Sequence, residues 1–159
     1  MPELSGRLRP VGRVAILVSR YNEAVTARLL DGALECCRSA GIPPDQVDVA
    51  WVAGAFELPV AAAAAAATGR YACLVALGAV IRGETAHFEY VAGEAARGLG
   101  EVAVRHALPV GFGVLTVDRL QQALERAGGS AGNKGYEAAA AAIQAADLLQ
   151  QLRSAHASP

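Results

Sequence analysis

Charged residues are scarce in this sequence. Only 18% of its 159 residues are Asp, Glu, Lys or Arg, whereas an ordinary soluble domain has about 25%. The 14 basic and 15 acidic residues nearly cancel, so the chain lacks the positive excess that binds nucleic acid or an anionic membrane surface. We expect one domain, since the length fits one, with neither nucleic acid nor a membrane as a partner.

Long hydrophobic runs and a secretory signal are also missing. The longest stretches without a charged side chain, at 58–69, 71–81 and 106–117, are shorter than the roughly 18 apolar residues of a membrane span. The segment 1–10 carries two arginines but no apolar region followed by a cleavage site. These absences predict a cytoplasmic protein.

Cysteine is limited to Cys36, Cys37 and Cys73, with no C-x-x-C pair. Such a set is typical of reduced thiols that serve as small core residues. No Cys, His, Asp or Glu pattern has the spacing of a metal site, and the motifs G-x-G-x-x-G and G-x-S-x-G are missing. We therefore expect neither a metal nor a cofactor.

Alanine, in contrast, is abundant: 36 of the 159 residues, including the run 61–67, in a chain that is 53% hydrophobic. Two interpretations are open. Alanine is small and only weakly apolar, so it inflates the hydrophobic total without consequence. Alternatively, much of the surface faces other subunits, because exposed apolar surface usually marks an interface.

Four short apolar runs alternate with segments of helical composition. The run 14–18 is β-branched and unbroken, as in a strand buried on both faces, and similar runs lie at 47–52, 73–80 and 110–115. Helices are predicted at 23–40, with Asn22 as N-cap, and at 58–68, 85–106, 120–127 and 134–153, the last after Asn133. Residues 1–12 are then an N-terminal arm and 154–159 a frayed tail.

This alternation predicts right-handed crossovers and a parallel sheet with helices on both faces. The expected fold is a three-layer, doubly wound (flavodoxin-like) α/β domain with four parallel strands, spanning 1–159. Ligands bind such sheets beyond the carboxyl ends of the strands. A site is therefore expected in the loops 19–22, 53–57, 81–87 and 116–118.

The first two of these loops offer groups for a flat or polyhydroxy ligand. Tyr21 follows the first strand, where its ring could stack on a heterocycle or pack under its own helix. Glu57 shares the second loop with Gly54 and Phe56 and precedes a helix. A carboxylate there complements the helix dipole or accepts hydrogen bonds from hydroxyl groups, and both alternatives stay open.

The third loop carries the most chemistry. Gly83 allows a turn, Thr85 lies where a helix start leaves free N–H groups for an anion, and His87 follows in the first turn. Because histidine titrates near neutral pH, His87 is a candidate for proton transfer, with a purely structural role as the alternative. His106, near a helix end, and His156, in the tail, are weaker candidates.

A glycine-rich segment, 128–135, has Arg126 before it and Lys134 within it. It lacks the adjacent Gly-Lys-Ser/Thr of a Walker A loop, which excludes a nucleotide-triphosphate site of that kind. Guanidinium and ammonium groups suit a phosphate ester. The residues alone thus indicate a cofactor-free α/β enzyme for a phosphorylated small molecule, with a flat ligand as a second candidate.

Five motifs resemble those of lumazine synthase, the penultimate enzyme of riboflavin biosynthesis: SRYNE, GAFELP, LGAVIRGETAHFEYV, FGVLT and ERAGGSAGNKG, in that order. The resemblance covers about residues 14–152. It implies a transferase that condenses 5-amino-6-(D-ribitylamino)uracil with 3,4-dihydroxy-2-butanone 4-phosphate. The product is 6,7-dimethyl-8-ribityllumazine, and phosphate and water are released.

The resemblance also implies roles for individual residues. His87 stands at the position of the proton-transfer residue. Tyr21 takes the place of a ring-stacking aromatic that is usually Phe or Trp, so its hydroxyl is a mild departure. The family's segment that holds the ribityl chain and the ring edge corresponds to Ala55, Phe56 and Glu57. The backbone that binds the uracil corresponds to Ala79, Val80 and Ile81. The phosphate site is matched by Glu84, Thr85, Arg126 and Lys134.

The same resemblance implies a homo-oligomer. Phe112 matches a residue that a neighbouring subunit contributes to the ring pocket, so the site would lie between subunits of a homopentamer. In many bacterial members pentamers form a hollow icosahedral shell, with riboflavin synthase as a candidate cargo, and the short connection 128–133 resembles that of shell-forming members. In such an assembly, subunit contacts would cover much of the alanine-rich surface.

Three alternatives stay open beside this interpretation. The archaeal-type riboflavin synthase shares the fold but dismutates two lumazines without phosphate. A carrier would bind a flavin or lumazine without turnover, although intact His87, Arg126 and Lys134 argue against it. A purely structural shell protein would make the site irrelevant.

Overall fold

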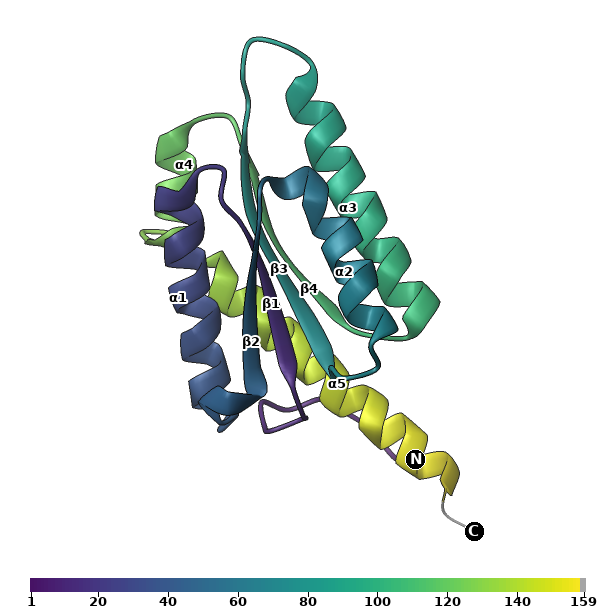
Figure 1. The fold of residues 1–159 in the computed structure, drawn as a ribbon. Coiled ribbons are helices and arrows are strands. Elements are labelled where there is room, and N and C mark those ends of the chain that lie inside the picture. Colours follow the sequence, from purple (N-terminus) through teal and green to yellow (C-terminus); the bar gives the residue numbers. More distant parts are fainter. Residues whose placement is uncertain (158–159) are drawn as a thin grey trace.

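The structure, a computed structural model, describes residues 1–157 and centres on a four-stranded parallel sheet (Figure 1). The strands are β1 (Val14–Ser19), β2 (Val47–Val52), β3 (Cys73–Ile81) and β4 (Val110–Val117), in the order β2-β1-β3-β4. Every neighbouring pair is parallel. The predicted doubly wound fold is confirmed, because β1 and β3 occupy the centre and the order reverses beside β1.

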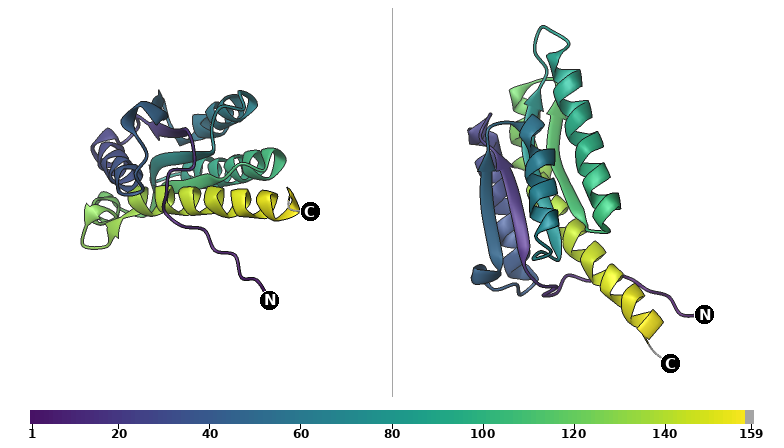
Figure 2. Two further views of the ribbon diagram at one scale, coloured as in Figure 1. Left: turned by 90° about the horizontal axis from the view of Figure 1, so that it is seen from below. Right: turned by 45° about the vertical axis from the view of Figure 1, so that its right-hand side comes forward.

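Helices cover both faces of the sheet (Figures 1 and 2). One face carries α2 (Leu58–Ala67) and α3 (His87–His106), and the other carries α1 (Glu23–Ser39), α5 (Lys134–Ala157) and the short α4 (Leu120–Glu125). Two 3-10 turns, Pro44–Gln46 and Ala55–Glu57, flank β2. Each face therefore has its own apolar core, one between the sheet and α2 and α3, the other between the sheet and α1 and α5.

Strand burial follows position in the sheet. All of β1 is buried, and so is β3 up to Val80, as their unbroken apolar runs predict. The same prediction is wrong for β2, which is only half-buried. As an edge strand, β2 pairs with β1 alone, and Val49 stays exposed.

The three cysteines lie in one core, on α1 and β3, and are free and buried as predicted. Burial raises the pKa of Cys36 and of Cys37 to about 11. Burial likewise raises the pKa of Cys73 to about 12. None is a thiolate near neutral pH, so none is an activated nucleophile.

Several helix boundaries and one predicted cap differ from the sequence prediction. Helices α1 and α2 end one residue earlier than predicted, and α4 ends at Glu125 rather than at Ala127, which begins a short strand. Helix α3 begins at His87, so Thr85 belongs to the preceding loop. Asn22 precedes α1 but makes no side-chain cap, whereas Asn133 does cap α5, since its Oδ1 accepts from the N–H groups of Gly135 and Tyr136 (2.8 and 3.1 Å). Helix α5 continues past Arg153, where fraying is predicted, to Ala157, and 158–159 lie outside the described residues.

The glycine-rich segment folds as a hairpin that the sequence does not predict. Its strands are β5 (Ala127–Gly129) and β6 (Gly132–Asn133). Gly128 and Gly132 have φ values of 97° and 80°, which favour glycine. The hairpin delivers the chain directly into α5.

The arm 1–12 runs across the amino-terminal ends of the strands to α5 (Figure 2). Asp147 of α5, only 2% exposed, accepts a hydrogen bond from the Arg7 N–H (2.7 Å) and pairs with the Arg9 guanidinium. The Gln150 side chain donates to the Val11 carbonyl (2.8 Å). In the described part of the chain, no helix is long and apolar enough to cross a membrane.

Candidate active site

An open cavity of about 760 Å³ lies at the carboxyl ends of β1, β2 and β3. The loops after these three strands and the first turn of α3 form its walls. It brings together nine residues that the sequence predicts for the site: Tyr21, Ala55, Phe56, Glu57, Ala79, Val80, Ile81, Thr85 and His87. It also includes Ala53, Gly54 and Gly83, which lie in the loops where the sequence predicts the site, and three residues of α3 that sequence reasoning missed: Phe88, Tyr90 and Val91.

Tyr21 projects into this cavity from the β1–α1 turn. Its side chain is 74% exposed, so it does not pack under its own helix. Hydrogen bonds hold the turn backbone to the end of β2, from the Arg20 N–H to the Val52 carbonyl (2.8 Å) and from the Tyr21 N–H to the Ala53 carbonyl (2.9 Å). An exposed ring on a fixed backbone can stack on a flat ligand.

Glu57 closes the β2–α2 turn. Its Oε1 accepts a hydrogen bond from the Gly54 N–H (3.0 Å), and the residue directly precedes Leu58, the first residue of α2. The carboxylate therefore lies near the positive end of a helix, and it also lines the cavity. Both open interpretations of Glu57 are compatible with this geometry, because a carboxylate accepts several hydrogen bonds.

Arg82 fixes the ends of the β3–α3 loop. Its Nε binds Asp118 (3.0 Å), Nη1 binds Glu89 (3.3 Å), and the guanidinium lies 4.4 Å from the centre of the Phe88 ring. Hydrogen bonds, first with Asp118 and then with Glu89, raise the pKa of Arg82. The loop 83–86 is thus anchored to β4, and His87 starts α3 directly after it.

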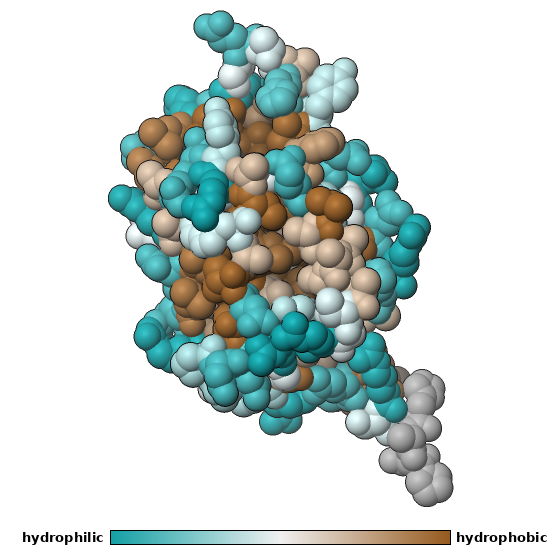
Figure 3. Space-filling view, viewed as in Figure 1, coloured by the Kyte–Doolittle hydropathy of each residue, from teal (hydrophilic) through white to brown (hydrophobic). Residues whose placement is uncertain are grey.

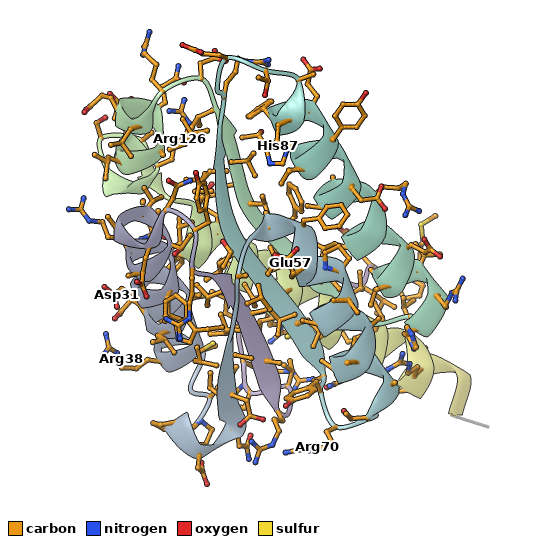
Figure 4. All side chains as sticks on the ribbon, turned by 45° about the horizontal axis from the view of Figure 1, so that its top comes forward. Asp31, Arg38, Glu57, Arg70, His87 and Arg126 are labelled. Carbon is orange, nitrogen blue, oxygen red and sulfur yellow. The ribbon has the colours of Figure 1, made fainter. Side chains whose placement is uncertain are left out.

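His87 and Thr85 line the cavity on its α3 side, opposite the β2–α2 turn. The His87 N–H is 3.4 Å from the Thr85 hydroxyl, a long hydrogen bond, and both residues are exposed. Figure 4 shows His87 at the carboxyl end of the sheet and Glu57 further down, on the α2 side. Glu84 is exposed and adjoins the lining residues Gly83 and Thr85, but does not itself line the cavity.

Besides Glu84, three further predicted site residues lie outside the cavity. Phe112, 40% exposed, sits on the edge strand β4 opposite Ala76. Arg126 directly follows α4, and its Nη1 donates to the Gln122 carbonyl (3.0 Å). It lies across β3 and β4 from His87 (Figure 4). The N–H of Lys134 donates to the Arg126 carbonyl (2.8 Å), so the two basic residues are neighbours.

The cavity consequently lacks a cation. None of its described lining residues is Lys or Arg, and Glu57 is its one carboxylate. Within residues 1–157, no cluster of His, Cys, Asp and Glu is arranged to hold a metal ion. A phosphate group in this cavity would need positive charge from outside the set of residues that line it.

These features define a doubly wound α/β protein with an aromatic and hydrogen-bonding cavity at the carboxyl edge of its sheet. Residues 12–150 match the family model of 6,7-dimethyl-8-ribityllumazine synthase, which is an enzyme family of transferases. The chain belongs to this family. The match includes the cavity and also Phe112, Arg126 and Lys134.

Proposed function

We propose that the chain condenses 5-amino-6-(D-ribitylamino)uracil with 3,4-dihydroxy-2-butanone 4-phosphate to 6,7-dimethyl-8-ribityllumazine. The observation that carries this proposal is the cavity, in which Tyr21, Glu57 and His87 come together at one edge of the sheet. An aromatic face, a hydroxyl acceptor and a proton-transfer group are the functions that a flat, ribityl-bearing amine and a phosphorylated ketone require. Family membership supports the same assignment.

The first ligand would lie between Tyr21 and the end of β3. Its ring stacks on Tyr21 and Phe56, and its hydroxyl groups donate to Glu57. The backbone of Val80 and Ile81 is available for the polar edge of the pyrimidine, because both residues line the cavity at the end of a strand. Backbone N–H and C=O groups in this position read a planar ring in one orientation.

The reaction then needs proton transfers at one place. The primary amine of the pyrimidine adds to the ketone carbonyl, and loss of water forms an imine. Removal of a proton and loss of phosphate follow, and the ribityl-bearing nitrogen closes the second ring with loss of another water. His87 serves the proton transfers, and holding both reactants together supplies much of the remaining rate.

The phosphate site is proposed to include a neighbouring subunit. Thr85 and Glu84 adjoin the cavity on one chain, whereas Phe112, Arg126 and Lys134 of the same chain lie outside it. A second copy that placed these three residues at the cavity would supply both the missing cations and a further aromatic ring. We therefore propose a homo-oligomer, either a pentamer or an icosahedral assembly of pentamers.

The surface is consistent with such an assembly. Hydrophobic residues gather in the middle of the face in Figure 3, and the large apolar side chains Val49 of β2 and Val60 of α2 are exposed. Exposed apolar patches usually mark contact surfaces. Cytoplasmic location and riboflavin synthase as cargo stay predictions.

An absorbance assay with the purified protein tests the proposed function. Lumazine should form only when both substrates are present, with one phosphate released for each product. Product from lumazine alone would instead indicate the riboflavin synthase reaction. Binding without turnover would indicate a carrier, and neither binding nor turnover a structural shell protein. Native mass spectrometry of the same sample gives the number of subunits.

A further inference from the structure

We infer that Asn22 is a positioning residue of this site, because its side-chain amide ties the turn that carries Tyr21 to the carbonyl of Ala79 on β3. The Nδ2 to O distance is 2.9 Å. Tyr21 and Ala79 both line the cavity, whereas Asn22 does not. The inference rests on the proposed function, since it concerns how the site binds the pyrimidine.

The backbone of Asn22 is in an uncommon conformation. Its φ and ψ are 62° and 47°, in the left-handed region, where only one other non-glycine residue of the described chain has a positive φ. Asn adopts this conformation more readily than most residues, but it still costs energy. Such conformations persist where surrounding contacts hold them, often at functional sites.

The amide is not needed to begin the helix. The N–H groups of Val25 and Thr26 donate to the Asn22 carbonyl (2.9 and 3.0 Å), and the Thr26 hydroxyl donates to the Ser19 carbonyl (2.7 Å). The first turn of α1 is therefore closed without the Asn22 side chain. This leaves the amide free to reach the neighbouring strand.

The hydrogen bond from Asn22 to Ala79 lies beyond the last backbone pairing between β1 and β3. Pairing between β1 and β3 stops at Val18 and Leu77, and beyond it the described backbone bonds of the turn go only to the end of β2. The Asn22 amide makes the corresponding connection to β3. The turn is thereby held on both sides, by backbone on the β2 side and by one side chain on the β3 side.

Tyr21 depends on this support because its ring has little packing of its own. A side chain that is 74% exposed takes its direction from its backbone rather than from neighbours. Ala79, in contrast, is 3% exposed and fixed within the sheet. The Asn22 amide thus sets the distance between the stacking ring and the backbone at the end of β3, which are the two parts of the site that contact one flat ligand.

Two substitutions separate the amide from the backbone conformation. Asn22→Gly accepts a left-handed φ without strain but removes the hydrogen bond. Asn22→Asp keeps the shape but replaces the donor by a carboxylate that faces the Ala79 carbonyl. Tyr71→Phe is the matched control. It removes one hydrogen bond, from the Tyr71 hydroxyl to Asp48 (2.7 Å), at the amino-terminal ends of the strands and away from the cavity.

For Asn22→Gly we expect the KM of the pyrimidine and the Kd of the lumazine product, from calorimetry, to rise roughly tenfold. The KM of the butanone phosphate should stay near the wild-type value. Asn22→Asp should be affected at least as strongly. Tyr71→Phe should have a similar melting temperature to Asn22→Gly but wild-type KM and Kd values.

Unchanged KM and Kd in Asn22→Gly would overturn the inference, and so would equal increases for both substrates. A wild-type protein that does bind and form the lumazine, but binds it no better than the two Asn22 variants do, would also overturn the inference. A wild-type protein that neither binds nor forms the lumazine overturns the proposed function itself. The two failures are therefore distinguishable.

Discussion

Replacement of Gly135 by alanine is expected to destabilise the fold strongly. Gly135 is the second residue of α5 and packs against the backbone of α1. A Cβ at this position would lie 1.9 Å from the carbonyl oxygen of Leu29 and 2.6 Å from its carbonyl carbon. The contact is with backbone, so no side-chain rotation can relieve it.

The size of the effect follows from that overlap. The two helices must separate by about 1.5 Å to restore van der Waals contact, and forced overpacking of this kind costs about 3 kcal/mol. For a chain of this length, that loss corresponds to a melting temperature lower by about 6–12 °C. The φ of Gly135 is outside the left-handed region, so steric overlap alone is the cause.

Gly100→Ala is the matched control. Gly100 lies in the interior of α3, and a Cβ there would meet nothing within 4 Å. Alanine should therefore stabilise the helix by about 0.5–1 kcal/mol. Calorimetric melting of both variants and the wild type, at one protein concentration, tests the pair. A Gly135→Ala protein that melts within about 2 °C of the wild type would refute the reasoning.

Three further predictions concern chemistry and pH. His87→Ala should lower kcat by about a hundredfold or more while the Kd of the lumazine product is retained, and an unchanged kcat would remove the proton-transfer role. Arg126→Ala should raise mainly the KM of the butanone phosphate in steady-state assays; a rise for the pyrimidine instead would place Arg126 elsewhere. The pKa of Asp147 lies below its ordinary value, first because the Arg7 N–H donates to the carboxylate. Its ionised form therefore stabilises the fold fully above pH of about 4, and this contribution is lost as the pH falls through the native pKa. Urea midpoints should accordingly fall less between pH 7 and pH 3 in Asp147→Asn than in the wild type, and an equal fall would contradict the assignment.

The central strands of the sheet were predictable because a strand that is buried on both faces appears in the sequence as an unbroken apolar run. The apolar runs of β1 and β3 coincide with the strands to within one residue, since a strand covered on both faces needs apolar side chains at every position. The run of β2 looks the same in sequence, yet the strand is half-buried. The exposure of β2 depends on its position as an edge strand, and the pattern of apolar residues in the sequence does not indicate that position.

Most of the cavity was predictable for a topological reason, since the loops after parallel strands meet at one edge. The roles of Asn22 and Arg82 were not. An Asn before a helix is usually an N-cap, and only the position of β3 shows that its amide binds elsewhere. Arg82 and Asp118 follow adjacent strands with opposite charges, a signal that could have indicated their ion pair.

The arm and α5 place both described ends of the chain away from the cavity. Asp147 and Gln150 hold the arm to α5, and the N-terminus and the last turns of α5 lie together at the pole opposite the β3–α3 loop (Figure 1). A purification tag or a fused peptide at either end would therefore leave the loops of the site unobstructed. Surface immobilisation through such a tag would present the cavity toward solution, which makes the chain a convenient subject for binding measurements on a sensor surface.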